Sequence, residues 1–167
     1  MVKIGVLSDT HSYLDDQILK HLRSCDVIFH AGDIGNMEVL EKIEALGKPT
    51  HAVYGNIDDD QVRKACPEHL TTTIDGVKFL MIHIAGKPGW YYPNVRDLIQ
   101  KEKPKVFICG HSHIVRVQYF EKLKHLHINP GACGKHGFHK VRTLLTFHIE
   151  EGKPTEMKLI ELEKRGQ

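Results

Sequence analysis

The sequence predicts an α/β protein with two sheets, folded as a single domain over residues 1–167. Two observations predict this fold. In the first third of the chain, short apolar runs alternate with segments whose apolar residues recur at helical spacing, a pattern typical of a mainly parallel sheet with helices on its faces. In the remainder, β-prone runs follow one another between turn residues, which indicates a second sheet.

The first third alternates predicted strands with predicted helices. The strands are the apolar runs Val2–Leu7, Val27–Phe29 and Thr50–Val53, each of a length typical of a buried strand. Leu14–Leu22 and Met37–Leu46 repeat their apolar residues every three or four positions, which predicts helices. Because each helix separates two strands, these strands are expected to lie parallel.

The rest of the chain is predicted to be mostly β. Leu70–Ile74 and Val77–Ile82 flank Asp75-Gly76, a strong signal for a β-hairpin. Pro93–Gln100 has helical spacing with a proline near its first turn, and Val106–Ile108 is another buried strand. Four further strands are expected at Val115–Phe120, His125–Ile128, Arg142–Ile149 and Thr155–Leu162.

Composition and charge exclude several classes of protein. The formal net charge of +2 is too close to balance to indicate a nucleic-acid or anionic-membrane partner. We expect no secretory signal and no membrane span, because no segment approaches ~20 apolar residues. Cys25, Cys66, Cys109 and Cys133 form no C-x-x-C pair, so a reducing, cytoplasmic setting with buried free thiols is expected.

Side chains that can bind metals follow the strands at their carboxyl ends. In α/β sheets this edge is where loops converge and ligands bind. The candidate residues are Asp9, His11, Asp33, Asn56, His83, His111 and His113. In extended backbone, residues two apart point to the same side, so Asp9 is expected to pair with His11, and His111 with His113. Together they predict a metal site.

The order of these motifs resembles that of the calcineurin-like metallophosphoesterases. The motifs are D-x-H, G-D, G-N, a single His and G-H-x-H, each behind a predicted strand. Further similarity to the small bacterial and archaeal branch is carried by Lys3–His11, Val27–Gly35, Val53–Asp58, Val106–His113 and Asn129–Gly131. The resemblance implies an αββα fold, a two-sheet β-sandwich flanked by helices, and a phosphodiesterase activity.

The resemblance also implies roles for the candidate residues. One metal ion is held by Asp9, His11 and His113, the other by Asn56, His83 and His111, and Asp33 bridges both. Two divalent ions bring four positive charges, and two carboxylates and one hydroxide neutralise three of them. About one positive charge is left to bind an anionic phosphoryl group. A metal-bound hydroxide would attack phosphorus in line, and no other catalytic residue is assigned. Manganese is the favoured metal, with iron, nickel and zinc left open.

The chain departs from the wider family at two positions. Many members have a His directly after the G-N asparagine, commonly assigned as the acid for the leaving group, but this chain has Ile57. An aliphatic side chain cannot donate a proton, so a phosphodiester with a good leaving group is favoured over a monoester. The usual His-Gly pair is replaced by His83-Ile84, which alters the following loop.

Several residues near the site have two readings. His30 is either a hydrogen-bonded core histidine or an orienter of the ligands, and Asp58 either orients a ligand or caps a helix. His136 and His139 are expected to be structural, with a substrate contact as the alternative. The Gly86–Tyr92 loop is either packed on the sheet or at a subunit contact, or forms a substrate wall.

Two functions compete with the enzyme. The retromer subunit of eukaryotic sorting complexes resembles this fold and works as a scaffold with a degenerate metal site, so a protein-binding module is the first alternative. A structural metal protein is the second, although structural zinc sites favour cysteine ligands and none is a candidate here. The expected partner is a small phosphate ester, and the oligomeric state stays open.

Overall fold

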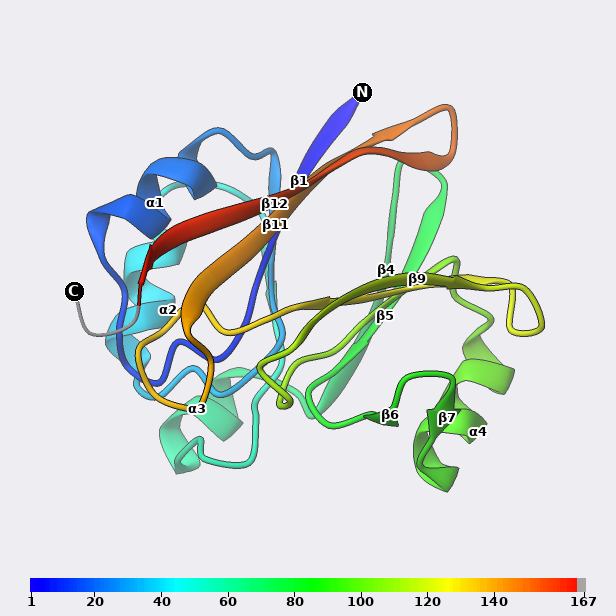
Figure 1. Ribbon diagram of the computed structural model, residues 1–167, viewed down its shortest axis with the longest axis horizontal. Helices are drawn as coiled ribbons and strands as arrows, with labels where there is room; N and C mark the ends of the chain where they lie inside the picture. Colours follow the sequence, from blue (N-terminus) through cyan, green and yellow to red (C-terminus); the bar gives the residue numbers. More distant parts are fainter. Residues whose placement is uncertain (165–167) are drawn as a thin grey trace.

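The first sheet is built around the buried strand β1 (Val2–Leu7). The computed structural model describes residues 1–164 (Figure 1). β1 pairs in parallel with β2 (Val27–His30), which pairs in parallel with β3 (Thr50–Ala52). On its other side β1 pairs antiparallel with β11 (Val141–Glu150), and β12 (Lys153–Lys164) forms the far edge. The predicted parallel first third is therefore confirmed, with an antiparallel hairpin from the end of the chain added to it.

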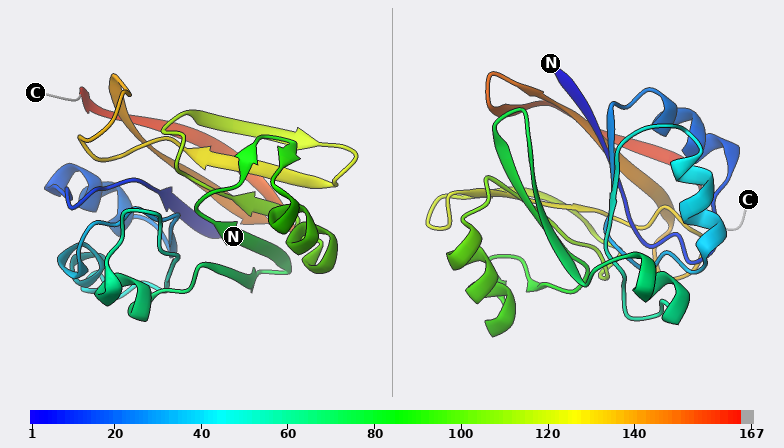
Figure 2. Two further views of the ribbon diagram at one scale, coloured as in Figure 1. Left: turned by 90° about the horizontal axis from the view of Figure 1, so that it is seen from below. Right: turned by 180° about the vertical axis from the view of Figure 1, so that it is seen from behind.

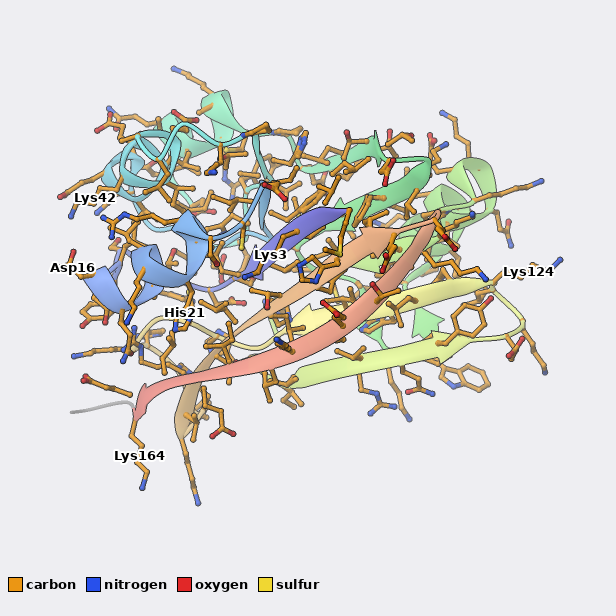
Figure 3. All side chains as sticks on the ribbon, turned by 90° about the horizontal axis from the view of Figure 1, so that it is seen from above. Lys3, Asp16, His21, Lys42, Lys124 and Lys164 are labelled. Atoms are coloured by element: carbon orange, nitrogen blue, oxygen red, sulfur yellow. The ribbon has the colours of Figure 1, made fainter. Side chains whose placement is uncertain are left out.

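Three helices cover the outer face of the first sheet. They are α1 (Asp16–Arg23), α2 (Met37–Glu44) and α3 (Asp60–Ala65), and each begins with a carboxylate or amide side chain that accepts a hydrogen bond from the first turn. Their apolar residues pack against Leu7 and Ile28 of the sheet. Charged residues of these helices, among them those labelled Asp16 and Lys42 in Figure 3, lie at the periphery. Helix α3 is absent from the sequence prediction.

The second sheet has the strand order β4-β5-β8-β10-β9. Its inner strands β5 (Val77–Ile82), β8 (Val106–Ile108) and β10 (His125–Pro130) are parallel, and the edges β4 (His69–Ile74) and β9 (Val115–Phe120) pair antiparallel with their neighbours. The predicted Asp-Gly hairpin joins β4 to β5. Both of its turn residues have positive φ, 47° and 78°, as a type I′ turn requires.

The two sheets pack face to face and bury a common core. Ile4 and Val6 of β1 point into it, and the ring of Phe29 stacks on that of Phe79 from the other sheet at 4.9 Å between centroids. The helix α4 (Pro93–Glu102) covers the outer face of the second sheet. It lies on the side of the molecule opposite α1, α2 and α3 (Figure 1, Figure 2). The αββα sandwich is therefore confirmed.

A small two-stranded ribbon stands apart from both sheets. It consists of β6 (Gly86–Lys87) and β7 (Trp90–Tyr91), and it lies within the loop that follows β5. Tyr91 anchors it, since this side chain is buried among residues of the second sheet and α4. Of the two readings of this loop, packing on the sheet is confirmed for Tyr91, whereas Trp90 is 79% exposed.

The remaining sequence expectations concern the thiols and the membrane. Cys25, Cys66, Cys109 and Cys133 are all buried and free, as expected for small core residues. Among residues 1–164, no helix combines the length and the apolar character that a membrane span requires.

Candidate metal centre

The candidate residues meet at one end of the sandwich. Strands β1 and β5 run downward in Figure 1, and the loops that follow them lie on the lower side of the molecule. Six of the seven residues form two groups in which the possible ligand atoms lie within 4.8 Å of one another. One group is Asp9, His11 and His113, and the other is Asp33, His83 and His111. Both sheets contribute to the centre, because β1 and β2 belong to one and β5 and β8 to the other.

The backbone that presents these side chains is left-handed rather than extended. The φ angles are 56° at Asp9, 44° at His11, 53° at Asp33, 73° at His111 and 61° at His113. The expectation of extended backbone at the D-x-H and H-x-H motifs was therefore wrong. Asp9 and His11 still meet, but His111 and His113 belong to different groups. A non-glycine residue in this region costs about 1–3 kcal/mol, and such strain concentrates at functional sites.

The carboxylate of Asp9 is buried at the centre of the first group. Its Oδ2 atom accepts hydrogen bonds from the Ser8 hydroxyl at 2.7 Å and from the His111 backbone N–H at 3.2 Å. Its Oδ1 atom lies 3.2 Å from His113 Nε2 and 3.8 Å from His11 Nε2. Burial alone would raise the pKa of Asp9, but the imidazoles of His11 and His113 outweigh it and hold that pKa well below its ordinary value. The carboxylate is therefore ionised.

The carboxylate of Asp33 lies between the two groups. Its Oδ2 atom is 3.2 Å from His83 Nε2 in its own group and 3.5 Å from His11 Nε2 in the other. Its Oδ1 atom accepts a hydrogen bond from the Ile57 N–H at 3.1 Å. Burial would raise the pKa of Asp33, but the adjacent imidazole of His83 lowers it on balance. One carboxylate oxygen therefore faces imidazole nitrogens of both groups.

The orientation of His83 is fixed by a backbone carbonyl. Its Nδ1 atom lies 2.6 Å from the Ala31 carbonyl oxygen, which can only accept, so Nδ1 carries a proton and donates. In the neutral imidazole, Nε2 then points a lone pair at the Asp33 oxygen. Two acceptors at 3.2 Å need a proton or a cation between them. Without a metal, a proton on His83 Nε2 is favoured. Burial lowers the pKa of His83, but the carboxylates of Asp33 and Asp9 raise it by more, so the net shift is upward.

Asn56 joins the second group at its exposed side. Its Oδ1 atom lies 3.0 Å from His111 Nδ1, and both side chains are exposed. Partial desolvation of the ring against the neighbouring side chains is the largest cause of the lowered pKa of His111, so this imidazole is neutral. A neutral imidazole and an amide oxygen are both suitable metal ligands. The structure therefore brings all seven predicted residues together.

Comparison with known proteins identifies the family. The profile of the calcineurin-like phosphoesterase superfamily domain matches residues 2–152. The chain belongs to this superfamily. A phosphodiesterase from Methanocaldococcus jannaschii is 28% identical to it in an alignment 149 residues long, and the match covers 79% of this chain and 84% of that protein. The family and this relative support a metal-dependent phosphoesterase.

Solved structures confirm the calcineurin-like fold. An archaeal phosphodiesterase has a TM-score of 0.71 at 24% identity, over 96% of this chain and 99% of its own. Vps29 from Chaetomium thermophilum has a TM-score of 0.73 at 13% identity, over 97% of each chain. At such identities the likeness establishes the fold alone.

Within this calcineurin-like domain, His30 links two loops of the centre. Its Nδ1 atom accepts a hydrogen bond from the Gly32 N–H at 3.2 Å, so the proton lies on Nε2, which donates to the Thr10 hydroxyl at 3.0 Å. That hydroxyl donates to the Ile34 carbonyl at 2.8 Å. Burial lowers the pKa of His30 to about 3, so the ring is neutral. His30 is thus a hydrogen-bonded core histidine that ties the loop after β1 to the loop after β2.

Asp58 ties together the loops that carry Asp33 and Asn56. Its carboxylate accepts hydrogen bonds from the backbone N–H groups of Gly55 at 2.7 Å, Gly35 at 2.8 Å and Ile34 at 3.1 Å. The reading of Asp58 as a helix cap was wrong, because Asp59 caps α3. Asp58 supports the centre through the backbone of two loops.

The loop between β10 and β11 forms a wall of the centre. Its backbone is bound to the loop after β1, where Gly134 N–H donates to the Asp9 carbonyl at 3.2 Å. The His136 ring lies 4.7 Å from the His11 ring, and the His139 ring 5.2 Å from the His113 ring. His136 and His139 both line a cavity of about 460 Å³ that opens over both groups.

Sequence reasoning assigned no role to two further residues of the centre. Ser8 donates to Asp9 Oδ2, and Asn129 donates through Nδ2 to the Gly110 carbonyl and the Ser112 hydroxyl, both at 3.0 Å. Asn129 thereby supports the loop that carries His111 and His113. The Asn-Pro-Gly motif around it was the available signal, since it matched the family without a stated function.

The residues present fit divalent metal ions. Three atoms of the centre are buried without a hydrogen-bond partner among the described residues: Asp9 Oδ1, His11 Nε2 and His83 Nε2. Leaving a buried polar atom unpaired costs ~1–3 kcal/mol, so such atoms call for a partner of another kind. Carboxylates and imidazoles that converge in this way are the ligands that borderline divalent ions take.

Proposed function

We propose that the protein is a dinuclear metal-dependent phosphodiesterase that acts on a small phosphate ester. One ion would be held by Asp9, His11 and His113, and the other by Asn56, His83 and His111, with Asp33 shared between them. Manganese is the proposed metal, since imidazole and carboxylate ligands suit it and no thiolate takes part.

The position of Asp33 is the observation that carries this proposal. Its Oδ2 atom faces His11 of one group and His83 of the other, at 3.5 and 3.2 Å. A carboxylate that serves two ions needs this placement. Asp9 and Asp33 are also the only carboxylates, within residues 1–164, that line either group. They bring two negative charges to a centre that would hold four positive ones.

When bound, two such ions would lower the pKa of a water molecule, orient the phosphoryl oxygens and stabilise in-line attack on phosphorus. The chain supplies the rigid frame for this chemistry. Ser8 and the His111 N–H hold one oxygen of Asp9 and leave the other for the centre. The Ala31 carbonyl fixes the tautomer of His83 so that Nε2 faces the centre.

A diester is the better substrate for this arrangement. Ile57 lines the cavity over the centre at the position where a proton donor stands in many family members. A general acid is typically worth ~10²–10⁴-fold, and its absence slows the departure of poor leaving groups most. The cavity is open to solvent and adjoins a second cavity, so both arms of a diester can be accommodated.

A scaffold without turnover is the competing function, and it rests on the shared fold of Vps29. The complete set of seven ligand-type residues favours the enzyme. The test is hydrolysis of bis(p-nitrophenyl) phosphate with added manganese, before and after chelation. We expect turnover that chelation abolishes and manganese restores.

The matched variants are His113→Ala, in the centre, and His69→Ala, exposed on β4. We expect His113→Ala to lose at least 100-fold in kcat and His69→Ala to keep wild-type rates. Absence of turnover with manganese, iron, nickel and zinc alike would favour the scaffold.

A further inference from the structure

We propose that the cavity beside the metal centre binds an anionic group on one arm of the diester, so that the preferred substrate carries a second phosphate beyond the scissile one. This cavity, called here the side cavity, lies between the β6–β7 ribbon and the loop after β8, and its volume is about 280 Å³. The inference rests on the proposed function, because it names the substrate class of that same site.

The side cavity is continuous with the metal centre. His111, Ser112 and Ile114 line both this cavity and the one that opens over the two ligand groups. Whole-ligand pockets usually measure ~300–1,000 Å³, so about 280 Å³ suits one arm of a substrate rather than all of it. A diester whose phosphoryl group lies at the centre would therefore extend one arm past His111 into the side cavity.

The charge of the side cavity is positive. Lys87 from β6 and Arg116 from β9 line it, and among the described residues no Asp or Glu does. Within residues 1–164, neither cation forms an ion pair. Arg116 is held by Gln118, whose Oε1 atom accepts from Nε at 2.9 Å and from Nη2 at 2.6 Å. A guanidinium fixed in this way is suited to bind a phosphate.

A buried hydrogen-bonded cluster anchors the β6–β7 ribbon, which carries Lys87. The Tyr91 hydroxyl lies 2.9 Å from His125 Nε2 and 2.7 Å from His127 Nδ1. A hydroxyl has one proton, so it donates to one ring and accepts from the other. Burial lowers the pKa of both histidines to about 4, so the cluster is neutral. The ribbon is thus held in place before any ligand arrives, which reduces the entropy cost of binding.

The remaining lining divides the cavity into an apolar and a polar part. Ile84, Pro88 and Tyr92 offer apolar and aromatic surface, which suits a sugar or a ring between two phosphates. Ser112 also lines the cavity over the metal centre, and Asn129 donates to its hydroxyl. The chemical class that fits is a phosphodiester with a compact, partly apolar arm that ends in an anion, such as a nucleoside phosphate.

Another cavity next to the metal centre, which Asn56 and His83 line, lacks these properties. Glu68 lines it, and the cation there, Arg63, already donates through Nε to the Asp58 carbonyl at 2.8 Å and lies 4.8 Å from the Tyr54 ring centroid. The carboxylate of Glu68 repels an anion, and the guanidinium of Arg63 is already bound to other groups, so this cavity is poorly suited to bind an anionic group. The side cavity is therefore the better place for a charged arm.

Two matched diesters test the inference, namely thymidine 5′-(p-nitrophenyl phosphate) with and without a 3′-phosphate. In the manganese-loaded protein we expect the 3′-phosphate to raise kcat/KM by roughly tenfold to hundredfold, mainly through KM. The double variant Lys87→Met, Arg116→Gln should bring the ratio of the two substrates to about one. A double variant of exposed cations elsewhere, Lys122→Met, Arg23→Gln, should keep the wild-type ratio.

Calorimetry gives a second readout that does not depend on turnover. Thymidine 3′,5′-bisphosphate should bind more tightly than thymidine 5′-monophosphate, and the Lys87→Met, Arg116→Gln variant should lose the difference. The inference is overturned if the kcat/KM values of the two diesters are about equal in the wild-type protein, or if their ratio is unchanged in the Lys87→Met, Arg116→Gln variant. Hydrolysis of either ester would in that case leave the proposed function standing. Binding that depends on Lys87 and Arg116 without hydrolysis of any diester supports the inference and contradicts the proposed function.

Discussion

Asp33 Oδ2 lies 3.2 Å from His83 Nε2, and the same oxygen is the one that faces His11 of the other ligand group. This contact joins the loop after β2 to the loop after β5, and so joins the two sheets. A carboxylate in this place can hold two cations close together, whereas a neutral side chain of the same shape cannot.

Replacing Asp33 is expected to abolish both metal binding and hydrolysis. Asp33→Ala removes the shared oxygen, so we expect fewer than one manganese ion per chain and a loss of at least ~10³-fold in kcat. Asp33→Asn keeps the shape but removes the charge and should lose most of its metal as well. Metal analysis and bis(p-nitrophenyl) phosphate turnover measure both effects. Full turnover by Asp33→Ala with two ions still bound would show that the assignment of Asp33 is wrong.

Two neighbouring aspartates should differ sharply in their effect on stability. Asp58→Ala leaves three backbone N–H groups without their acceptor, at ~1–3 kcal/mol for each that stays buried. Asp59→Ala removes only the cap of α3, which is worth ~1 kcal/mol. We expect the free energy of unfolding in urea to fall by at least ~3 kcal/mol in the first variant. Equal losses in both would contradict the role given to Asp58.

Ile57 should make the reaction sensitive to the leaving group. It is 45% exposed and lines the cavity over the centre, where it offers no proton to a departing oxygen. We expect bis(p-nitrophenyl) phosphate to react far faster than diphenyl phosphate, and Ile57→His to narrow that difference by at least tenfold. Ile57→Leu serves as the control. An unchanged ratio in Ile57→His would show that position 57 does not reach the leaving group.

The buried cluster of Tyr91, His125 and His127 should make stability depend on pH. The pKa of each histidine is near 6.5 in the unfolded chain and about 4 in the folded one. Between these values the unfolded state binds more protons, so this contribution to stability is complete above pH ~6.5 and is lost as the pH falls towards 4. Each pKa unit corresponds to ~1.4 kcal/mol.

Urea unfolding of the metal-free protein between pH 7.5 and 4.5 measures this effect. His127→Gln keeps a hydrogen-bonding partner for Tyr91 but cannot be protonated in this range. We therefore expect a shallower loss of stability with falling pH in His127→Gln than in the wild-type protein. Identical slopes would mean that protonation of His127 does not contribute to acid unfolding.

The strands and the order of ligand-type residues could be predicted because both are local signals. Val2–Leu7 and Val106–Ile108 are apolar runs, and Asp9 and His111 follow them within three residues. Because such runs are buried as strands, the residues that follow them lie at the sheet edge. Helix α3 was not predicted because it is six residues long and buries only Val62, so its apolar residues form no periodic pattern. The β6–β7 ribbon has two residues in each strand and shows no alternation.

The details of the centre depend on contacts that no local pattern encodes. His111 and His113 lie in different ligand groups, and both have positive φ. The sequence of this motif favoured an extended backbone and gave no sign of this conformation. His136 lies beside His11 because β11 pairs with β1, and the pair Val6–Leu145 brings the loop before β11 next to the loop after β1. Such pairings follow from the packing of the whole sheet rather than from the spacing of histidines.

The most direct test of two ions that share Asp33 is a crystal structure of the manganese-loaded protein with anomalous data at the manganese edge. We expect two peaks ~3.5–4 Å apart. One should lie among Asp9, His11 and His113 and the other among Asn56, His83 and His111, with an oxygen of Asp33 bound to each. A single peak, or two peaks of which Asp33 contacts only one, would contradict the account.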